Sequence, residues 1–153
     1  MRDFIIGIDP GLTGGISVMR RNGKVVASVK MPETEQEIRD FVLTYIGYTQ
    51  LIVIEQVQPM PTGTIAMFKL GRSYGFLRGI IVMTSVRYDE VRPAVWQAAL
   101  RCLSRGKKAV TRQRAQQLFP DTRITNANAD SLLIAEWARR YLIYGGKQLG
   151  KGK

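Results

Sequence analysis

The stretch Phe4-Ile-Ile-Gly-Ile-Asp9, followed by Pro10 and Gly11, decides how the rest of the chain folds. Its apolar run predicts a buried β-strand, and the Pro-Gly pair predicts a tight turn directly after it. Most acids lie on helix surfaces or in turns, so an acid that closes an apolar strand needs a reason. One reason is local, because Asp favours turns. The other is functional, because ligands of open α/β sheets gather where strands end.

The next two segments, residues 14–19 and 24–30, predict further strands. Between them Asn22-Gly23 is a strong signal for a two-residue hairpin. The first three strands are therefore expected to form an antiparallel meander.

A helix is predicted over residues 33–46, which combine a helical apolar period with acids in the first turn. The short apolar strand 51–54 follows and ends at Glu55. Because a helix separates this strand from the meander, we expect a crossover and a parallel pairing.

The second half of the chain predicts mostly helices. After a loop with Pro59 and Pro61, the long segment 65–85 carries Gly71, Gly75 and Gly79 at intervals of four. That row favours a helix that closely approaches a sheet or another helix. The remaining expected elements are a strand at 86–91, helices at 93–103 and 107–119, and a last helix capped by Thr125 or Asn126 that runs to about Tyr144.

The chain is expected to form one α/β domain. Its 153 residues suit a single domain, with element order βββαβαβααα over residues 1–144 and a loose basic tail over 145–153. Hydrophobic residues make up 45% and charged residues 23%, which is typical of a globular protein. No apolar run reaches the roughly 18 residues that span a bilayer, and the N-terminal stretch is unlike a signal peptide. We therefore expect a cytoplasmic protein without a membrane partner.

Two residue counts exclude whole classes of chemistry. There is no histidine and only one cysteine, Cys102. Catalytic triads with histidine, Cys-His dyads, His-ligated metals, four-thiolate zinc sites and intrachain disulfides are all excluded. Carboxylates are therefore the natural candidates for catalysis.

The charge balance predicts a polyanionic partner. Lys plus Arg number 23 and Asp plus Glu number 12, which gives a net charge of +11. Nucleic acid is the commonest partner of so basic a domain, although a merely solubilising surface has the same composition. Charge alone does not separate a binder from an enzyme.

Three acids and one amide form the candidate site. Asp9 and Glu55 close two apolar strands, and Asn126 and Asp130 lie near the start of the last helix. Carboxylates that converge raise each other's pKa unless a cation neutralises them, and oxygen ligands select Mg²⁺ or Mn²⁺. The alternative is that Asp9 only forms a turn and that Asn126 and Asp130 only cap a helix.

The ordered motifs resemble the RuvC-type Holliday junction resolvases of the ribonuclease H-like superfamily, over residues 3 to about 143. The segments that carry the likeness are Gly7-Ile-Asp-Pro-Gly11, Val53-Ile-Glu-Gln-Val57 and Ala129-Asp-Ser-Leu-Leu-Ile-Ala135. The segments Lys69-Leu-Gly71, Arg92-Pro-Ala-Val-Trp-Gln97, Gly106-Lys-Lys108 and Gln117-Leu-Phe-Pro120 are similar to the phage and plasmid branch. The resemblance implies a mixed five-stranded sheet flanked by helices.

The resemblance also implies an activity. The family uses four acids to bind two divalent ions, Mg²⁺ or Mn²⁺, and cuts paired strands of a four-way DNA junction to leave 5′-phosphate ends. Asp9, Glu55 and Asp130 match three of these acids, while Asn126 stands where the fourth is expected. Either three charges suffice, or residue 126 carries an inactivating Asp-to-Asn change. We favour the second, because an Asp there completes the pattern.

Further roles follow from the same resemblance. A homodimer is implied, since two strands are cut together, and residues 65–85 are its candidate interface. The acid-free basic run assigned to DNA contacts consists of Arg105, Lys107, Lys108, Arg112 and Arg114. Gln58 replaces the aromatic residue that opens the junction centre in many members, which leaves Met60 and Phe68 as further candidates. A phage origin would place the protein in the bacterial host cytoplasm.

Two other functions stay open at this point. One is a protein that binds DNA junctions without cutting them, with Asn126 as the native residue. The other is a ribonuclease H-like nuclease that acts on flaps or DNA–RNA hybrids.

Overall fold

The computed structural model describes residues 1–145, so nearly all of the expected tail 145–153 lies outside the described residues. Its elements follow the predicted order. They are β1 (Phe4–Asp9), β2 (Gly15–Arg20), β3 (Val25–Lys30), α1 (Glu35–Ile46), β4 (Thr49–Glu55), α2 (Thr64–Met83), β5 (Tyr88–Val91), α3 (Pro93–Ala99), α4 (Lys108–Leu118), α5 (Ala129–Ala138) and the π-helical turn η1 (Arg139–Ile143).

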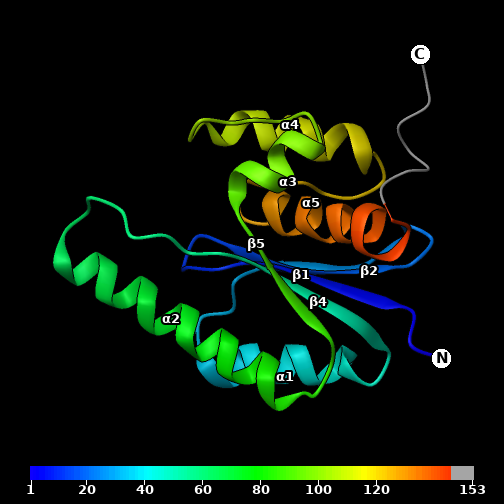
Figure 1. Cartoon of the computed structure of the whole chain (residues 1–153), viewed down its shortest axis with the longest axis horizontal. Coiled ribbons are helices and arrows are strands. Elements are labelled where there is room, and N and C mark those ends of the chain that lie inside the picture. The colour runs from blue at the N-terminus through cyan, green and yellow to red at the C-terminus, as the bar shows by residue number, and fades with distance from the viewer. Residues whose placement is uncertain (146–153) are drawn as a thin grey trace.

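The strands form one mixed sheet in the order β3-β2-β1-β4-β5. Strands β1, β2 and β3 pair antiparallel, which confirms the meander. Strand β4 pairs parallel with both β1 and β5, which confirms the crossover. Helices α3, α4 and α5 cover one face of the sheet, and α1 and α2 lie on the other (Figure 1). This is the mixed five-stranded sheet flanked by helices that the sequence resemblance implies.

The alternation of side chains along β1 and β4 assigns the acids to one face. Ile6 and Ile8 pack in the core beneath α1 and α2, whereas Ile5 packs with the residues of α5. Asp9 follows Ile5 and Gly7 at intervals of two, and therefore projects toward the α5 face. Glu55 has the same relation to Leu51 and Val53, which belong to the α5-side core.

Gly7 allows α5 to lie directly on β1. A Cβ at this position would stand 2.2 Å from the Ser131 carbonyl oxygen and 2.6 Å from the Ala135 backbone nitrogen. All ten residues of α5 are buried, because α5 is packed between the sheet and the helices α3 and α4 (Figure 1). The missing side chain therefore fixes how closely the first turn of α5 approaches the end of β1.

The structure differs from the sequence predictions at two places. A Cβ added at Gly71, Gly75 or Gly79 would contact no neighbouring element of the described residues within 4 Å, so the close approach that the glycine row favours is not made within this part of the chain. The last helix begins at Ala129 rather than near Thr125 or Asn126. The cause is Asn128, whose side-chain oxygen accepts from the Thr125 backbone N–H at 2.7 Å and holds residues 125–128 in a turn.

Gly7→Ala is expected to destabilise the fold. The added methyl group meets backbone atoms of α5, which cannot rotate away, so we expect a loss of about 1–3 kcal/mol, as for other overpacked cores. Urea denaturation measures the loss. Gly47→Ala is the matched control, since no described atom lies within 4 Å of its added Cβ. Equal stability of the two variants would contradict the close contact between β1 and α5.

Candidate active site

The three predicted acids come together at one end of the sheet. Asp9 ends β1 and Glu55 ends β4, and the two strands pair in parallel with Ile8 opposite Ile54. Asp130 lies in the first turn of α5, the helix that covers this face. Asp9 and Asp130 are each only 6% exposed. We call Asp9, Glu55 and Asp130 the acid cluster.

Lys108, the first residue of α4, reaches into the acid cluster. Its Nζ donates to Asp130 Oδ2 at 2.7 Å and lies 3.7 Å from Asp9 Oδ2. Glu55 is held from another side, because the Trp96 indole N–H donates to its Oε2 at 2.7 Å. The sequence places Lys108 and Trp96 in motifs, but neither contact was predicted.

The carboxyl groups of the cluster resist ionisation. Burial, reinforced by the charge of Glu55, raises the pKa of Asp9 to about 8 despite the opposing effect of Lys108. Burial also raises the pKa of Glu55 to about 7, although the Trp96 hydrogen bond opposes it. Burial lowers the pKa of Lys108, but the combined attraction of the acids outweighs it and the net pKa rises. The surroundings of Asp9 and Glu55 therefore favour the neutral acids over the carboxylates.

The donor set suits a hard divalent cation. Carboxylate oxygens are preferred ligands of Mg²⁺ and Mn²⁺. Asp130 Oδ1 is buried and has no hydrogen-bond partner within the described residues, which leaves one oxygen available. As the side chains stand, with Lys108 among them, the described residues contain no group of three or more His, Cys, Asp or Glu arranged to hold a metal. The residue types fit a cation, and the present arrangement contains an ammonium group instead.

Asn126 lies apart from the helical face that carries Asp130. It is exposed in the turn before α5, and its side-chain oxygen accepts from Arg112 Nη1 at 3.2 Å. Residues 126 and 130 do not lie on one helix face, because the helix starts at Ala129. A ligand role for Asn126 stays a prediction. Asn128 is engaged within the turn, where its amide also donates to the Arg123 carbonyl oxygen at 3.0 Å.

The basic residues of the predicted DNA surface have different environments. Arg105 and Lys107 are exposed near the start of α4. Arg114 Nε donates to the Leu100 carbonyl oxygen at 2.8 Å and joins α4 to the end of α3. Arg112 contacts Asn126, as described above, and Lys108 contacts the acid cluster. Within the described residues, Arg105 and Lys107 are therefore the two members of this set whose side chains form no hydrogen bond or salt bridge.

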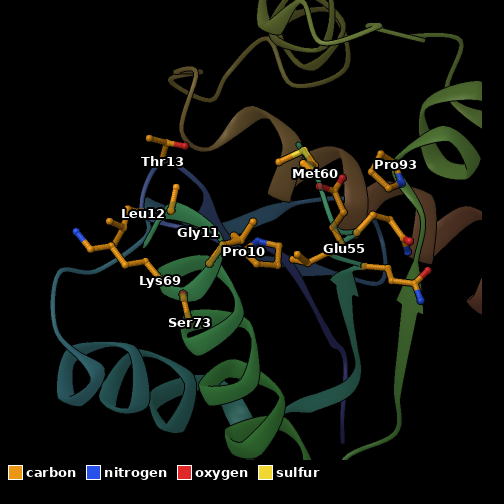
Figure 2. Close-up of a pocket in the computed structure, with 14 residues that line it drawn as sticks. Pro10, Gly11, Leu12, Thr13, Glu55, Met60, Lys69, Ser73 and Pro93 are labelled. Atoms are coloured by element: carbon orange, nitrogen blue, oxygen red, sulfur yellow. The ribbon is translucent and has the colours of Figure 1, made fainter. Parts of the chain in front are cut away.

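A pocket of about 480 Å³ adjoins the acid cluster at Glu55. It is enclosed by the loop after β1, the segment after β4 and the first half of α2, as Figure 2 shows. Gln58 and Met60, two candidates for the junction centre, line it. Phe68, the third candidate, is 70% exposed on α2 and is not among the residues that line this pocket.

Solved structures with the same fold are Holliday junction resolvases. RuvC of Thermus thermophilus, in complex with a Holliday junction substrate, has a TM-score of 0.66 at 18% identity and covers 94% of this chain and 96% of its own. The yeast mitochondrial Holliday junction resolvase has a TM-score of 0.57 at 11% identity, with 96% of this chain and 82% of its own covered. The fowlpox virus resolvase, in complex with its substrate Holliday junction DNA, has a TM-score of 0.53 at 12% identity, with 94% of this chain and 99% of its own covered.

These likenesses confirm the fold that the motifs predicted. No protein-family model and no curated protein matches the chain. Assignment to the phage and plasmid branch stays a prediction. No helix within residues 1–145 is long and apolar enough to cross a membrane.

The metal-free protein is expected to lose stability as the pH rises from 5 to 8.5. A carboxyl group whose pKa is raised in the fold stabilises it fully below its ordinary pKa, near 4, and this stabilisation is lost as the pH passes the raised pKa. For Asp9 and Glu55 the loss therefore falls between pH 4 and about 8. The chain has no histidine to titrate in this window.

Urea denaturation in EDTA at both pH values measures the effect. Asp9→Asn should reduce the loss by at least about 1.4 kcal/mol, the equivalent of one pKa unit. Asp121→Asn is the control, because Asp121 is exposed and is not a cause of either pKa shift. A wild-type protein that is as stable at pH 8.5 as at pH 5 would contradict the assigned pKa values.

Proposed function

We propose that the protein is a divalent-metal-dependent endonuclease that resolves four-way DNA junctions. The observation that carries the proposal is the acid cluster, built from three separate elements at one end of a resolvase fold. The net charge of +11 supports a polyanionic substrate. The similar solved structures that contain Holliday junction DNA support a branched DNA substrate.

In this proposal Asp9, Glu55 and Asp130 hold Mg²⁺ or Mn²⁺, with two ions per site. The metal supplies Lewis-acid chemistry, which lowers the pKa of a bound water and stabilises charge on the leaving oxygen. The chain's own residues orient the ligands, and the Trp96 N–H fixes one oxygen of Glu55. Buried surroundings exclude bulk water from Asp9 and Asp130. The expected products carry 5′-phosphate and 3′-hydroxyl ends.

The DNA contacts are proposed along the start of α4. Arg105 and Lys107 are exposed there, beside Lys108 of the acid cluster. Such side chains bind phosphates and position the backbone, without reading its sequence. Arg112 borders the same surface through its contact with Asn126. We assign Arg114 to the packing of α4, because its guanidinium is bound to the Leu100 carbonyl.

A homodimer is proposed through α2. One face of this helix exposes a set of apolar and small residues that we call the α2 stripe, made of Ile65, Phe68, Gly75, Gly79 and Val82. The exposed Arg72 lies on the same face. Large apolar side chains exposed in a row indicate a contact surface, and small residues allow two helices to approach closely. Two symmetry-related sites are what paired cuts require. Gln58, Met60 and Phe68 near the start of α2 are proposed to contact the junction centre.

A second candidate function has one observation in its favour. Asn126 is neutral and its oxygen is bound by Arg112, so a protein that binds junctions without cutting them is consistent with this site. Cleavage assays with the variants below separate the two functions.

Asp9→Asn, Glu55→Gln and Asp130→Asn are each expected to lower junction cleavage in Mg²⁺ by at least about 10²-fold, because a misplaced reacting group costs about this much. Junction binding should change little, since the basic surface is untouched. Gel-based cleavage and binding assays measure both, with Asp121→Asn as the control. If the parent is inactive, the comparison is made in an Asn126→Asp background. A variant that cuts at the parental rate removes that residue from the proposed site.

Asn126→Asp is expected to raise Mg²⁺-dependent junction cleavage by at least about 10²-fold, because a further carboxylate improves the placement of the cation. Single-turnover rates over a Mg²⁺ series measure the effect. Asn128→Asp is the comparison variant, since Asn128 is engaged within its turn. Equal rates for wild type and Asn126→Asp at every concentration would exclude residue 126 as a ligand.

Gly75→Arg is expected to convert a dimer into a monomer, because a long charged side chain then replaces a glycine of the α2 stripe and keeps the two helices apart. Sedimentation velocity measures the mass, and junctions should be nicked on one strand rather than on two. Gly47→Arg adds the same charge where no described atom lies within 4 Å of the new Cβ, and it should stay dimeric. A wild-type protein that is monomeric when bound to a junction would contradict this interface.

A further inference from the structure

The ammonium group of Lys108 lies where a cation is needed. Its Nζ is 2.7 Å from Asp130 Oδ2 and 3.7 Å from Asp9 Oδ2. The charge of Glu55 also acts on it. The charge of Lys108 thus acts on three carboxyl groups. No other cation of the described residues forms a salt bridge with any of them.

The backbone of Lys108 is held in place by the packing of α4, whereas its side chain has room to move. α4 is fixed by buried Thr111 and Ala115 and by the bond from Arg114 to the Leu100 carbonyl. The Lys108 side chain itself is 49% exposed, whereas those of Asp9 and Asp130 are 9% exposed. The flexible four-carbon stem of a lysine lets the charge move while its backbone stays in place.

The ammonium group of Lys108 leaves some oxygens of the acid cluster without a close partner. Asp130 Oδ1 is buried without a partner in the described residues, and Asp9 Oδ2 lies 3.7 Å from the Lys108 Nζ, beyond hydrogen-bond distance. A single charge at 3.7 Å from Asp9 therefore neutralises this carboxyl group incompletely. A divalent cation carries twice the charge and binds several oxygens at once.

We propose that Lys108 is an internal counter-ion, which occupies the acid cluster in the metal-free protein and is displaced when a divalent cation binds. Displacement releases the ammonium group at the surface proposed to bind DNA, beside Lys107. Since coupling between two ligands is reciprocal, metal and DNA phosphate then strengthen each other's binding. The inference rests on the proposed function only in taking the acid cluster as a cation site.

The first test compares Lys108→Met with Lys107→Met, both without DNA. Lys107 is the matched control because it is adjacent, exposed and in no salt bridge within the described residues. In EDTA, Lys108→Met should melt at a lower temperature than the control, because the acids then repel each other without a counter-ion. In a Mn²⁺ or Mg²⁺ titration, the midpoint of its thermal stabilisation should fall by at least about tenfold.

Either of two results would overturn the proposal. One is an equal metal midpoint in both variants, which makes Lys108 irrelevant to the cation. The other is weaker metal binding by Lys108→Met, which makes the lysine a support of the metal site rather than its occupant.

The second test uses the wild-type protein and does not depend on the folding of a variant. An amine-reactive reagent labels lysines, and tandem mass spectrometry separates modification at Lys107 from modification at Lys108. Added Mg²⁺ should raise the labelling of Lys108 relative to Lys107 several-fold over the EDTA sample, while an unchanged ratio contradicts displacement. Neither test includes DNA. If the protein passes both tests yet cuts no junction, either as wild type or as Asn126→Asp, the proposed function is refuted and this inference still stands.

Discussion

The close contact between β1 and α5 is the constraint on which the rest of the structure depends. Gly7 permits it, because any side chain there would meet the backbone of Ser131 and Ala135. The contact positions the first turn of α5 over the end of β1, and so Asp130 is placed near Asp9. Parallel pairing of β4 with β1 then brings Glu55 to the same edge. Three acids far apart in sequence thereby share a small, largely buried volume.

At pH values where the acids ionise, that arrangement opposes folding unless positive charge is supplied. Burial raises the pKa of Asp9 and of Glu55, which means that the fold disfavours their charged forms. A protein selected only for stability has no need of such a cluster, and perturbed acids gathered in one place are typical of functional sites. Lys108 supplies one charge from within the chain. The proposed metal would supply more, and the basic surface around α4 is proposed to hold a phosphate backbone beside it.

The sequence predicted the elements of this site better than their contacts. Strand alternation and the crossover depend on local patterns, so β1, β4 and the common edge of Asp9 and Glu55 could be foreseen. The contact of Lys108 with Asp130 could not, because it depends on how α4 packs against α5, which no local pattern encodes. The start of α5 was misplaced because Thr125, Asn126 and Asn128 are all good caps by residue type, and only the turn closed by Asn128 distinguishes them. The glycine row of α2 was expected to approach a sheet or another helix closely, yet it contacts no other element within the described residues. The spacing of the glycines indicated a close contact, but it did not indicate which element forms the other side of that contact.

The central claim is that this acid cluster cuts branched DNA, and a substrate panel tests it most directly. A four-way junction, a linear duplex of the same sequence, a flap and a DNA–RNA hybrid are incubated with the Asn126→Asp protein in Mg²⁺ and in EDTA. The account predicts Mg²⁺-dependent cuts at symmetry-related positions in two opposed strands of the junction, with ligatable 5′-phosphate ends and far slower cleavage of the other substrates. Tight junction binding without cleavage in Mg²⁺ or Mn²⁺, or a preference for the flap or the hybrid, would contradict it.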